Sequence, residues 1–118
     1  VHIRRDDRES AIESCQEVVR RLEAGMTMCV FPEGTRTRDG ALGPFKKGMF
    51  RVAVDAGRAV VPVAIRGLHD VSPYGTSLVA SGPIEIRIGR PIPPPPPGPE
   101  ACEALSQLVH QALETALR

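Results

Sequence analysis

The stretch MTMCVFPEGTRTRDGALGPFKKGMF, residues 26–50, decides how we interpret the fold. Its first six residues, 26–31, are mostly apolar and uncharged, as is typical of a strand buried in a parallel sheet. Pro32 ends the predicted strand, because proline has no N–H to donate to a sheet ladder. A loop rich in glycine and charge follows, and residues 45–56 then carry apolar side chains at helical spacing. The stretch therefore predicts a strand, a loop and a helix, with the loop at the carboxyl end of the strand.

Further elements flank this unit on both sides. Apolar residues recur at helical spacing before Gly25, which predicts a first helix that starts near Asp6 or Asp7. Residues 59–65 are apolar and predict a second buried strand. Residues 84–89 alternate between apolar and polar, which is typical of a half-exposed or edge strand. This order of elements predicts an α/β fold with a mixed, mostly parallel sheet flanked by helices.

The last third of the chain contains a proline tract and one more helix. Residues 91–99 are too rich in proline for a helix or a sheet, so we expect an extended connector. Residues 100–118 predict an amphipathic helix, which could lie on a membrane or pack on the sheet. Its polar face is not rich in Lys or Arg, which favours packing on the sheet.

Composition excludes several classes of protein. The net charge of +1 disfavours a nucleic-acid binder, and so does the absence of tryptophan from a chain with a single tyrosine. The three cysteines form no C-x-x-C pair, so we expect no metal site and no metal cofactor. No apolar run approaches the roughly 20 residues that a membrane-spanning helix requires. Any anion site in this chain must therefore be local.

The loop after residue 31 has the composition of such an anion site. Gly34 would let the backbone approach a ligand closely, while the Thr35 hydroxyl and the Arg36 guanidinium are donors to phosphate. Lys46 and Lys47 are predicted to begin the next helix, whose N-terminus also favours anions. These residues are our candidates for a phosphate-binding site.

Glu33, in the same loop, has two interpretations. Its carboxylate could orient Arg36 or accept a hydrogen bond from a substrate hydroxyl. The simpler alternative is a charged turn with an internal ion pair between Glu33 and Arg36, and composition alone does not separate these readings.

Three motifs follow one another along the chain: FPEGTR at residues 31–36, FKKG at residues 45–48 and VVPVAI at residues 60–65. In this order they resemble the glycerophospholipid acyltransferase family, and in particular its 1-acyl-sn-glycerol-3-phosphate (lysophosphatidic acid) acyltransferases. The first matches the third block of the family, which helps to bind the glycerol phosphate. The last contains the fourth block. The resemblance also implies an acyl or structural pocket formed by Phe31, Pro32, Val61, Pro62 and Val63.

The first two blocks of the family match less well. The second block usually reads Phe-Ile-Asp-Arg, and residues 2–5 stand in its place, which would make Arg5 a second phosphate ligand. The alternative for Arg5 is a solvated residue before the first helix. The first block, His-x-x-x-x-Asp, supplies the general base of the family. His2 and Asp7 have this spacing, but they overlap the second block, so we interpret them as a coincidental match.

The resemblance implies a single, partial acyltransferase domain that is truncated at its N-terminus, since the chain begins at Val1 in sequence that already resembles the second block. Its parts would be a substrate-binding α/β part (1–90), a connector (91–99) and a C-terminal helix (100–118). The implied enzyme transfers a fatty acyl group from acyl-CoA or acyl carrier protein to lysophosphatidic acid, at the cytoplasmic face of a membrane. We expect the present chain to lack the catalytic His. The alternative is a non-catalytic module that binds phospholipid or phosphate.

Overall fold

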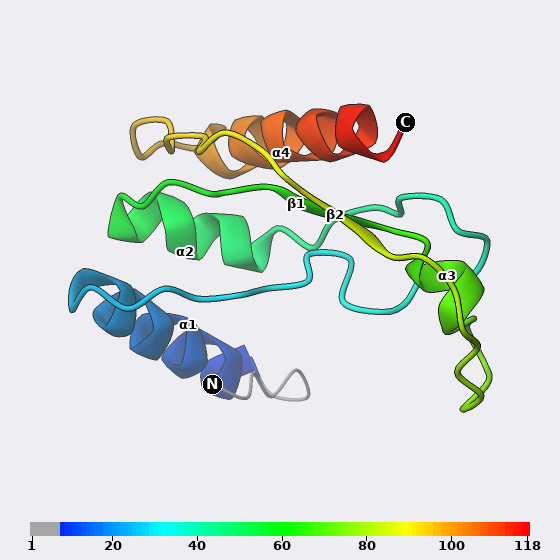
Figure 1. The fold of residues 1–118 in the computed structure, drawn as a ribbon. Coiled ribbons are helices and arrows are strands. Elements are labelled where there is room, and N and C mark those ends of the chain that lie inside the picture. Colours follow the sequence, from blue (N-terminus) through cyan, green and yellow to red (C-terminus); the bar gives the residue numbers. More distant parts are fainter. Residues whose placement is uncertain (1–7) are drawn as a thin grey trace.

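The structure is a computed structural model that describes residues 8–118 (Figure 1). The elements follow the order α1 (Arg8–Glu23), α2 (Gly48–Ala56), β1 (Val63–Arg66), α3 (Leu68–Val71), β2 (Glu85–Ile88) and α4 (Ala101–Leu117). Helix α4 lies on one side, β1 and α2 lie in the middle, and α1 lies on the far side (Figure 1). The layered arrangement of helices around a small sheet agrees with the predicted α/β class.

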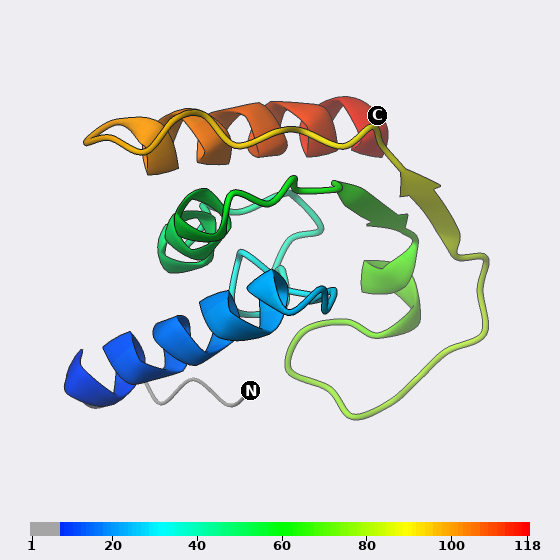
Figure 2. The ribbon, with the colours of Figure 1, turned by 90° about the vertical axis from the view of Figure 1, so that its left-hand side faces the viewer.

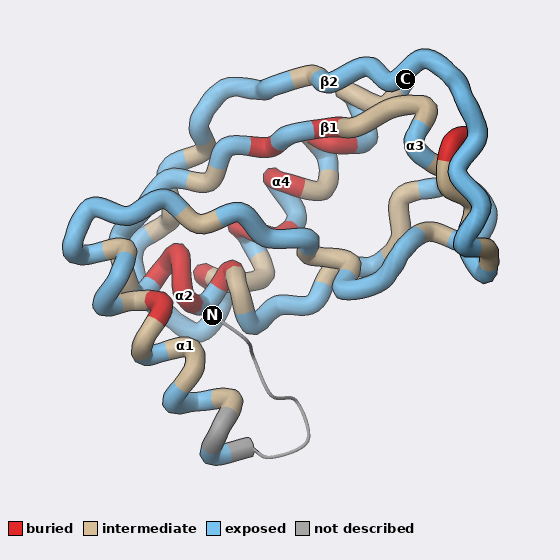
Figure 3. The backbone as a smooth tube through the Cα atoms, turned by 60° about the horizontal axis from the view of Figure 1, so that its bottom comes forward, coloured by how far each residue is buried: buried red, intermediate tan, exposed pale blue. Residues whose placement is uncertain are grey.

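The core lies where α2, α4 and β1 meet. On α4, Leu105, Val109 and Leu113 recur at intervals of four residues, which places them on one buried face of the helix. They form a cluster with Phe50, Ala53, Val54, Ala64 and Ala101. Burial of each large aliphatic side chain contributes about 1.5–3 kcal/mol relative to an exposed one. Figure 3 shows buried positions on α2, α4 and β1, while the loops around them are mostly exposed.

The predicted helices are confirmed, with one changed boundary. The middle helix begins at Gly48 rather than at residue 45, because the Lys46 N–H donates to the Pro32 carbonyl at 2.8 Å and holds this segment in the loop. The helix ends at Gly57 as predicted, where φ is 61° and the N–H donates to Val54 at 3.1 Å. The prediction that the last helix packs on the sheet is also confirmed, since α4 contacts β1.

The buried strand predicted at residues 26–31 is not confirmed by the described chain, in which these residues form no strand. This segment pairs with no other described strand, and Met26, Val30 and Phe31 are 55%, 42% and 74% exposed. A strand needs a neighbour to take up its backbone hydrogen bonds. The two strands of the described sheet, β1 and β2, pair with each other instead.

The sheet is one antiparallel pair. Val63 lies opposite Ile88, and Arg66 lies opposite Glu85. The described residues therefore do not confirm the mostly parallel arrangement. The strand predicted at residues 59–65 is shorter than expected, because Pro62 cannot donate to a ladder.

That strand is also buried on one face only. Ala64 is 2% exposed against α4, whereas Val61 and Val63 are both 46% exposed on the other face. The edge strand predicted at residues 84–89 is confirmed as β2, in which Ile88 is 73% exposed. After β2, Ile92 in the proline tract forms an isolated bridge with Val60, while residues 97–99 bend and turn into α4 beside α2.

Candidate anion-binding site

The candidate loop is closed at its base by backbone hydrogen bonds. The Gly34 N–H donates to the Phe31 carbonyl at 3.0 Å, and the positive φ of Gly34, 71°, is one that glycine adopts without strain. The bond from Lys46 to Pro32 then joins the two ends of the loop. The motif Phe-Pro-Glu-Gly-Thr-Arg therefore begins a loop that returns to its own starting point directly before α2.

Glu33 supports this loop from the inside. Its carboxylate is half-buried, and Oε2 accepts the N–H of Gly43 at 2.8 Å. Gly43 fits closely there, because a Cβ at this position would lie 3.2 Å from the same oxygen. Neither of the two readings from the sequence assigned this role, which joins residues ten positions apart.

The internal ion pair of a charged turn is absent from the described residues. Arg36 has no carboxylate within ion-pair distance there, and its Nη1 donates instead to Ser72 Oγ at 3.3 Å. A guanidinium has five N–H donors, so this single contact leaves most of them available. The simpler alternative for Glu33 and Arg36 is therefore wrong, and Arg36 keeps its capacity for an anion.

A second turn orders the residues that follow Arg36. Asp39 Oδ1 accepts the N–H of Ala41 at 3.0 Å and lies 3.1 Å from the Thr37 hydroxyl. The Ala41 N–H, followed by the Thr37 hydroxyl, lowers the pKa of the Asp39 carboxyl. Asp39 is thus a structural acceptor within the loop.

The loop also rests on α3 and on the residues that follow it. The Arg38 guanidinium carbon lies 5.0 Å from the centre of the Tyr74 ring, which is within the range of a cation–π contact. The His69 ring lies beside Gly40, where an added Cβ would come within 3.3 Å of it. With Ser72, these residues form a support for the two arginines. Sequence reasoning missed Ser72 and Tyr74, because they lie more than 30 positions from the arginines and carry no local signal.

The two candidate lysines have different surroundings. Lys47 forms an ion pair with Glu103 of α4, and Lys47 is the main cause of the lowered pKa of the Glu103 carboxyl. Lys46 is exposed and forms no ion pair within the part of the chain that the structure describes. Of the two, Lys46 is the better placed to reach an anion, while Lys47 joins the start of α2 to α4. Thr35 is exposed beside Arg36.

The predicted pocket residues differ in their exposure, and their role as an acyl or structural pocket stays a prediction. Pro62 is buried and Pro32 is half-buried, whereas Phe31, Val61 and Val63 are exposed. An open groove of about 710 Å³ lies elsewhere, between α1 and α2, and none of these five residues lines it. His2, Arg5 and Asp7 lie outside the described residues.

Residues 8–118 contain neither a cluster of metal ligands nor a helix that could span a membrane. No three His, Cys, Asp or Glu side chains in this range come together as metal ligands would. None of the helices in the same range combines the length and apolar character that crossing a bilayer requires.

Comparisons with known proteins agree with the motifs. A family model described as Acyltransferase matches residues 1–66. The chloroplastic 1-acyl-sn-glycerol-3-phosphate acyltransferase of Arabidopsis thaliana is 38% identical over 93 residues, which cover 78% of this chain and 26% of the relative. The human 1-acyl-sn-glycerol-3-phosphate acyltransferase alpha is 34% identical over 89 residues, which cover 75% of this chain and 31% of the relative.

A solved structure is similar in fold as well. The 1-acyl-sn-glycerophosphate (LPA) acyltransferase PlsC of Thermotoga maritima is 31% identical with a TM-score of 0.75, over 90% of this chain and 45% of that one. The fold and the motif thus define an acyltransferase domain. The chain belongs to the glycerophospholipid acyltransferase family, and it spans about a quarter to a half of the relatives and the solved structure described here.

Proposed function

We propose that the protein is a 1-acylglycerol-3-phosphate O-acyltransferase of phospholipid biosynthesis. It would transfer a fatty acyl group from acyl-CoA or acyl carrier protein to lysophosphatidic acid and so form phosphatidic acid. The observation that carries this proposal is the conformation of residues 31–36. Their loop is supported internally by Glu33, and Arg36 is left without a carboxylate partner among the described residues. The curated relatives of the chain are named for this activity.

In this proposal the loop holds the phosphate of the acceptor. Arg36 supplies paired N–H donors to the phosphate, and Lys46 adds a positive charge. Gly34 lets the phosphate come close to the backbone, and Thr35 lies beside it. Lys47 acts indirectly, by fixing the start of α2 on α4. Arg5, which the resemblance assigns to the same phosphate, stays a prediction.

The reaction itself needs a general base. The base takes the proton from the acceptor hydroxyl, whose oxygen attacks the thioester carbonyl, and the thiolate of the donor leaves with a proton. The resemblance assigns the base to a His-x-x-x-x-Asp block, which His2 and Asp7 match in spacing only. The described histidines have other contacts, since His69 packs beside Gly40 and His110 packs on the Phe45 ring at 4.8 Å.

We further propose that residues 26–31 form a strand of a larger, mostly parallel sheet in the complete domain. The exposed apolar side chains of Met26, Val30 and Phe31 support this, and so does the exposed face of β1 around Val63. A neighbouring strand would take up the backbone hydrogen bonds of residues 26–31.

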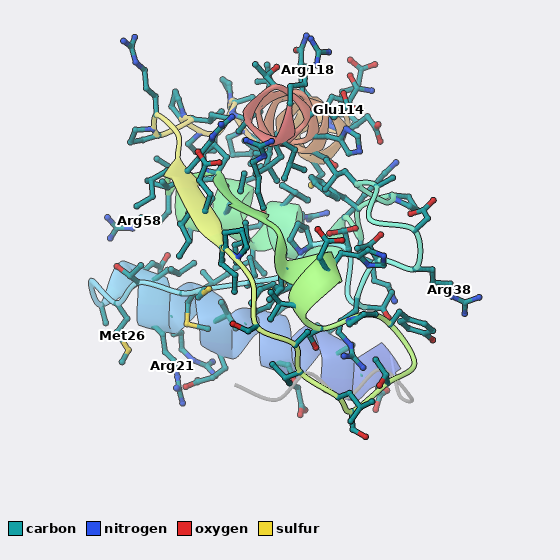
Figure 4. All side chains as sticks on the ribbon, turned by 45° about the vertical axis from the view of Figure 1, so that its right-hand side comes forward. Arg21, Met26, Arg38, Arg58, Glu114 and Arg118 are labelled. Atoms are coloured by element: carbon teal, nitrogen blue, oxygen red, sulfur yellow. The ribbon has the colours of Figure 1, made fainter. Side chains whose placement is uncertain are left out.

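The test is Arg36→Ala in the full-length protein, with Arg58→Ala as the matched control. Both arginines are exposed, and Arg58 lies on the opposite side of the molecule from Arg38, the neighbour of Arg36 along the loop (Figure 4). Loss of a charge-assisted phosphate contact costs about 2–4 kcal/mol, so kcat/KM for lysophosphatidic acid should fall by roughly 30-fold to 1000-fold. Arg58→Ala should leave it unchanged.

Two results would contradict the proposal in different ways. Unchanged acceptor kinetics in Arg36→Ala would remove Arg36 from the phosphate site. Binding of lysophosphatidic acid by the full-length protein without any turnover would show the alternative, a non-catalytic phospholipid-binding module.

A further inference from the structure

Residues 72–83, between α3 and β2, form an unusual loop. They swing out from the body of the molecule beyond α3 (Figure 2). No charged residue occurs from residue 71 to residue 84, although charged residues make up 25% of the chain. A long exposed loop without charge has no evident role in the solubility of the domain.

The tip of this loop presents two large apolar side chains to the solvent. Leu78 is 79% exposed and Val79 is 74% exposed. The tip is held in place, since the Leu78 N–H donates to Thr76 Oγ1 at 3.0 Å and the Ala80 N–H donates to the Val71 carbonyl at 2.8 Å. The structure therefore fixes a pair of apolar side chains that point away from the core.

The base of the same loop carries an aromatic ring beside positive charge. Tyr74 is 44% exposed and lies under the Arg38 guanidinium, and Ser72 accepts a hydrogen bond from Arg36. Tyrosine and arginine favour the headgroup region of a bilayer, where the apolar part of each side chain is buried and the polar end stays hydrated. The loop is thus apolar at its tip and carries an aromatic ring and positive charge where it joins the domain. This order matches a bilayer surface, in which the acyl chains lie below the charged headgroups.

We propose that the loop of residues 72–83 docks the protein on a bilayer that contains anionic phospholipid, with Leu78 and Val79 inserted among the acyl chains. Arg36 and Arg38 would then lie at the depth of the phosphates. This inference rests on the proposed function in one respect, because the acceptor that Arg36 would hold is itself a bilayer lipid. Docking through this loop brings the anion loop to the depth at which that phosphate lies.

The sequence provides a direct test, because the chain contains no tryptophan. A Leu78→Trp variant carries one fluorescent probe at the tip. We expect its emission to shift to the blue on vesicles of phosphatidylcholine with phosphatidic acid, and brominated acyl chains to quench it. Leu108→Trp on α4, where Leu108 is 49% exposed, is the matched control and should show neither effect.

A second probe separates the loop from the exposed face of the sheet. Ile88, on β2, is 73% exposed. Quenching of Ile88→Trp without quenching of Leu78→Trp would overturn the proposal and assign bilayer contact to the sheet. No quenching at either position would also overturn it. Circular dichroism first establishes that each variant keeps its helices.

Sedimentation with the same vesicles measures the contribution of the tip to binding. We expect the double variant Leu78→Ser, Val79→Ser to bind at least roughly tenfold more weakly, given the apolar area that it removes. Equal binding of the wild type to vesicles of pure phosphatidylcholine would contradict the role of the anionic lipid.

Turnover in detergent micelles separates this inference from the proposed function. In the full-length protein, the double variant should acylate micellar lysophosphatidic acid at the wild-type rate and lose activity only on vesicles. A wild-type protein that binds vesicles through Leu78 but never acylates the lipid would refute the proposed function alone. A double variant with full activity on vesicles would refute the docking loop alone.

Discussion

The core between α2 and α4 and the loop of residues 31–46 are ordered by different kinds of contact. The core is held by apolar burial, as at Leu105, which is fully buried, while the loop is held by hydrogen bonds such as the one from Gly43 to Glu33. Apolar burial depends on area and not on direction, whereas a hydrogen bond requires its partner at one place. The core therefore provides stability, and the loop provides the geometry of the site.

The largest effect is expected in the core. Leu105→Ala should lower the free energy of unfolding by about 2–5 kcal/mol, because it leaves a cavity in a close-packed interior. Leu108→Ala on the same helix is the matched control, since Leu108 is 49% exposed and its replacement should cost far less. Urea denaturation followed by circular dichroism measures both. Equal losses would show that α4 is not packed as described.

The next effect concerns Gly67, at the junction between the core and the site. Its φ is 83°, and an added Cβ would lie 2.2 Å from the Pro83 carbonyl oxygen. Gly67→Ala should cost about 1–2 kcal/mol for the left-handed backbone and about 1–3 kcal/mol more for the clash. Gly75→Ala is the control, because Gly75 has a φ of 80° with no atom close to the added Cβ.

The difference between the two glycine variants isolates the clash from the backbone strain. Urea denaturation gives that difference directly. If Gly75→Ala costs as much as Gly67→Ala, then Pro83 does not lie against Gly67, and the base of the docking loop is placed differently from what we describe.

A smaller effect is expected inside the anion loop. Glu33→Ala removes the acceptor for the half-buried Gly43 N–H, which should cost about 1–3 kcal/mol. Glu33→Gln keeps an acceptor oxygen at the same reach and should recover most of the loss. In the full-length protein, both stability and KM for lysophosphatidic acid should follow this order. A Glu33→Gln variant as impaired as Glu33→Ala would show that the negative charge itself is required.

The spacing of apolar residues along the sequence was sufficient to predict the two helices that form much of the core. Apolar spacing and the stop at Gly57 located α2 and α4, because helix periodicity is a property of adjacent residues. The same reasoning could not decide the state of residues 26–31, since an apolar run becomes a strand only when another strand lies beside it, and no described strand does. The antiparallel pairing of β1 with β2 likewise depends on residues about 20 positions apart.

The site was predictable in its residue types but not in its contacts. The motif at residues 31–36 and its resemblance identified Arg36 and Glu33 as candidates. Their partners, Ser72 and Gly43, could not be predicted, because a serine or a glycine in a loop has no pattern that marks a tertiary hydrogen bond. Long-range polar contacts are set by the fold as a whole.

The smallest expected effect on stability is that of an ion pair between the end of the anion loop and the core. Lys47 at the start of α2 pairs with Glu103 on the core helix, and this pairing lowers the pKa of the Glu103 carboxyl below its ordinary value of 4.5. A carboxyl with a lowered folded-state pKa contributes stability above its unfolded-state pKa. That contribution is lost as the pH falls through the lowered folded-state value.

The free energy of unfolding should therefore decrease as the pH falls below about 4.5, and Glu103→Gln should remove part of this dependence. The pair is exposed, so 1 M salt should screen it and reduce the pH dependence that it contributes in the wild type. The Glu103→Gln variant lacks the pair, so salt should not change this contribution there. Urea denaturation at several pH values, with and without salt, measures the effect of the substitution and the effect of salt on this pH dependence. A pH dependence that Glu103→Gln leaves intact would mean that Lys47 is free of α4, and Lys47 would then be available to the anion loop beside Lys46.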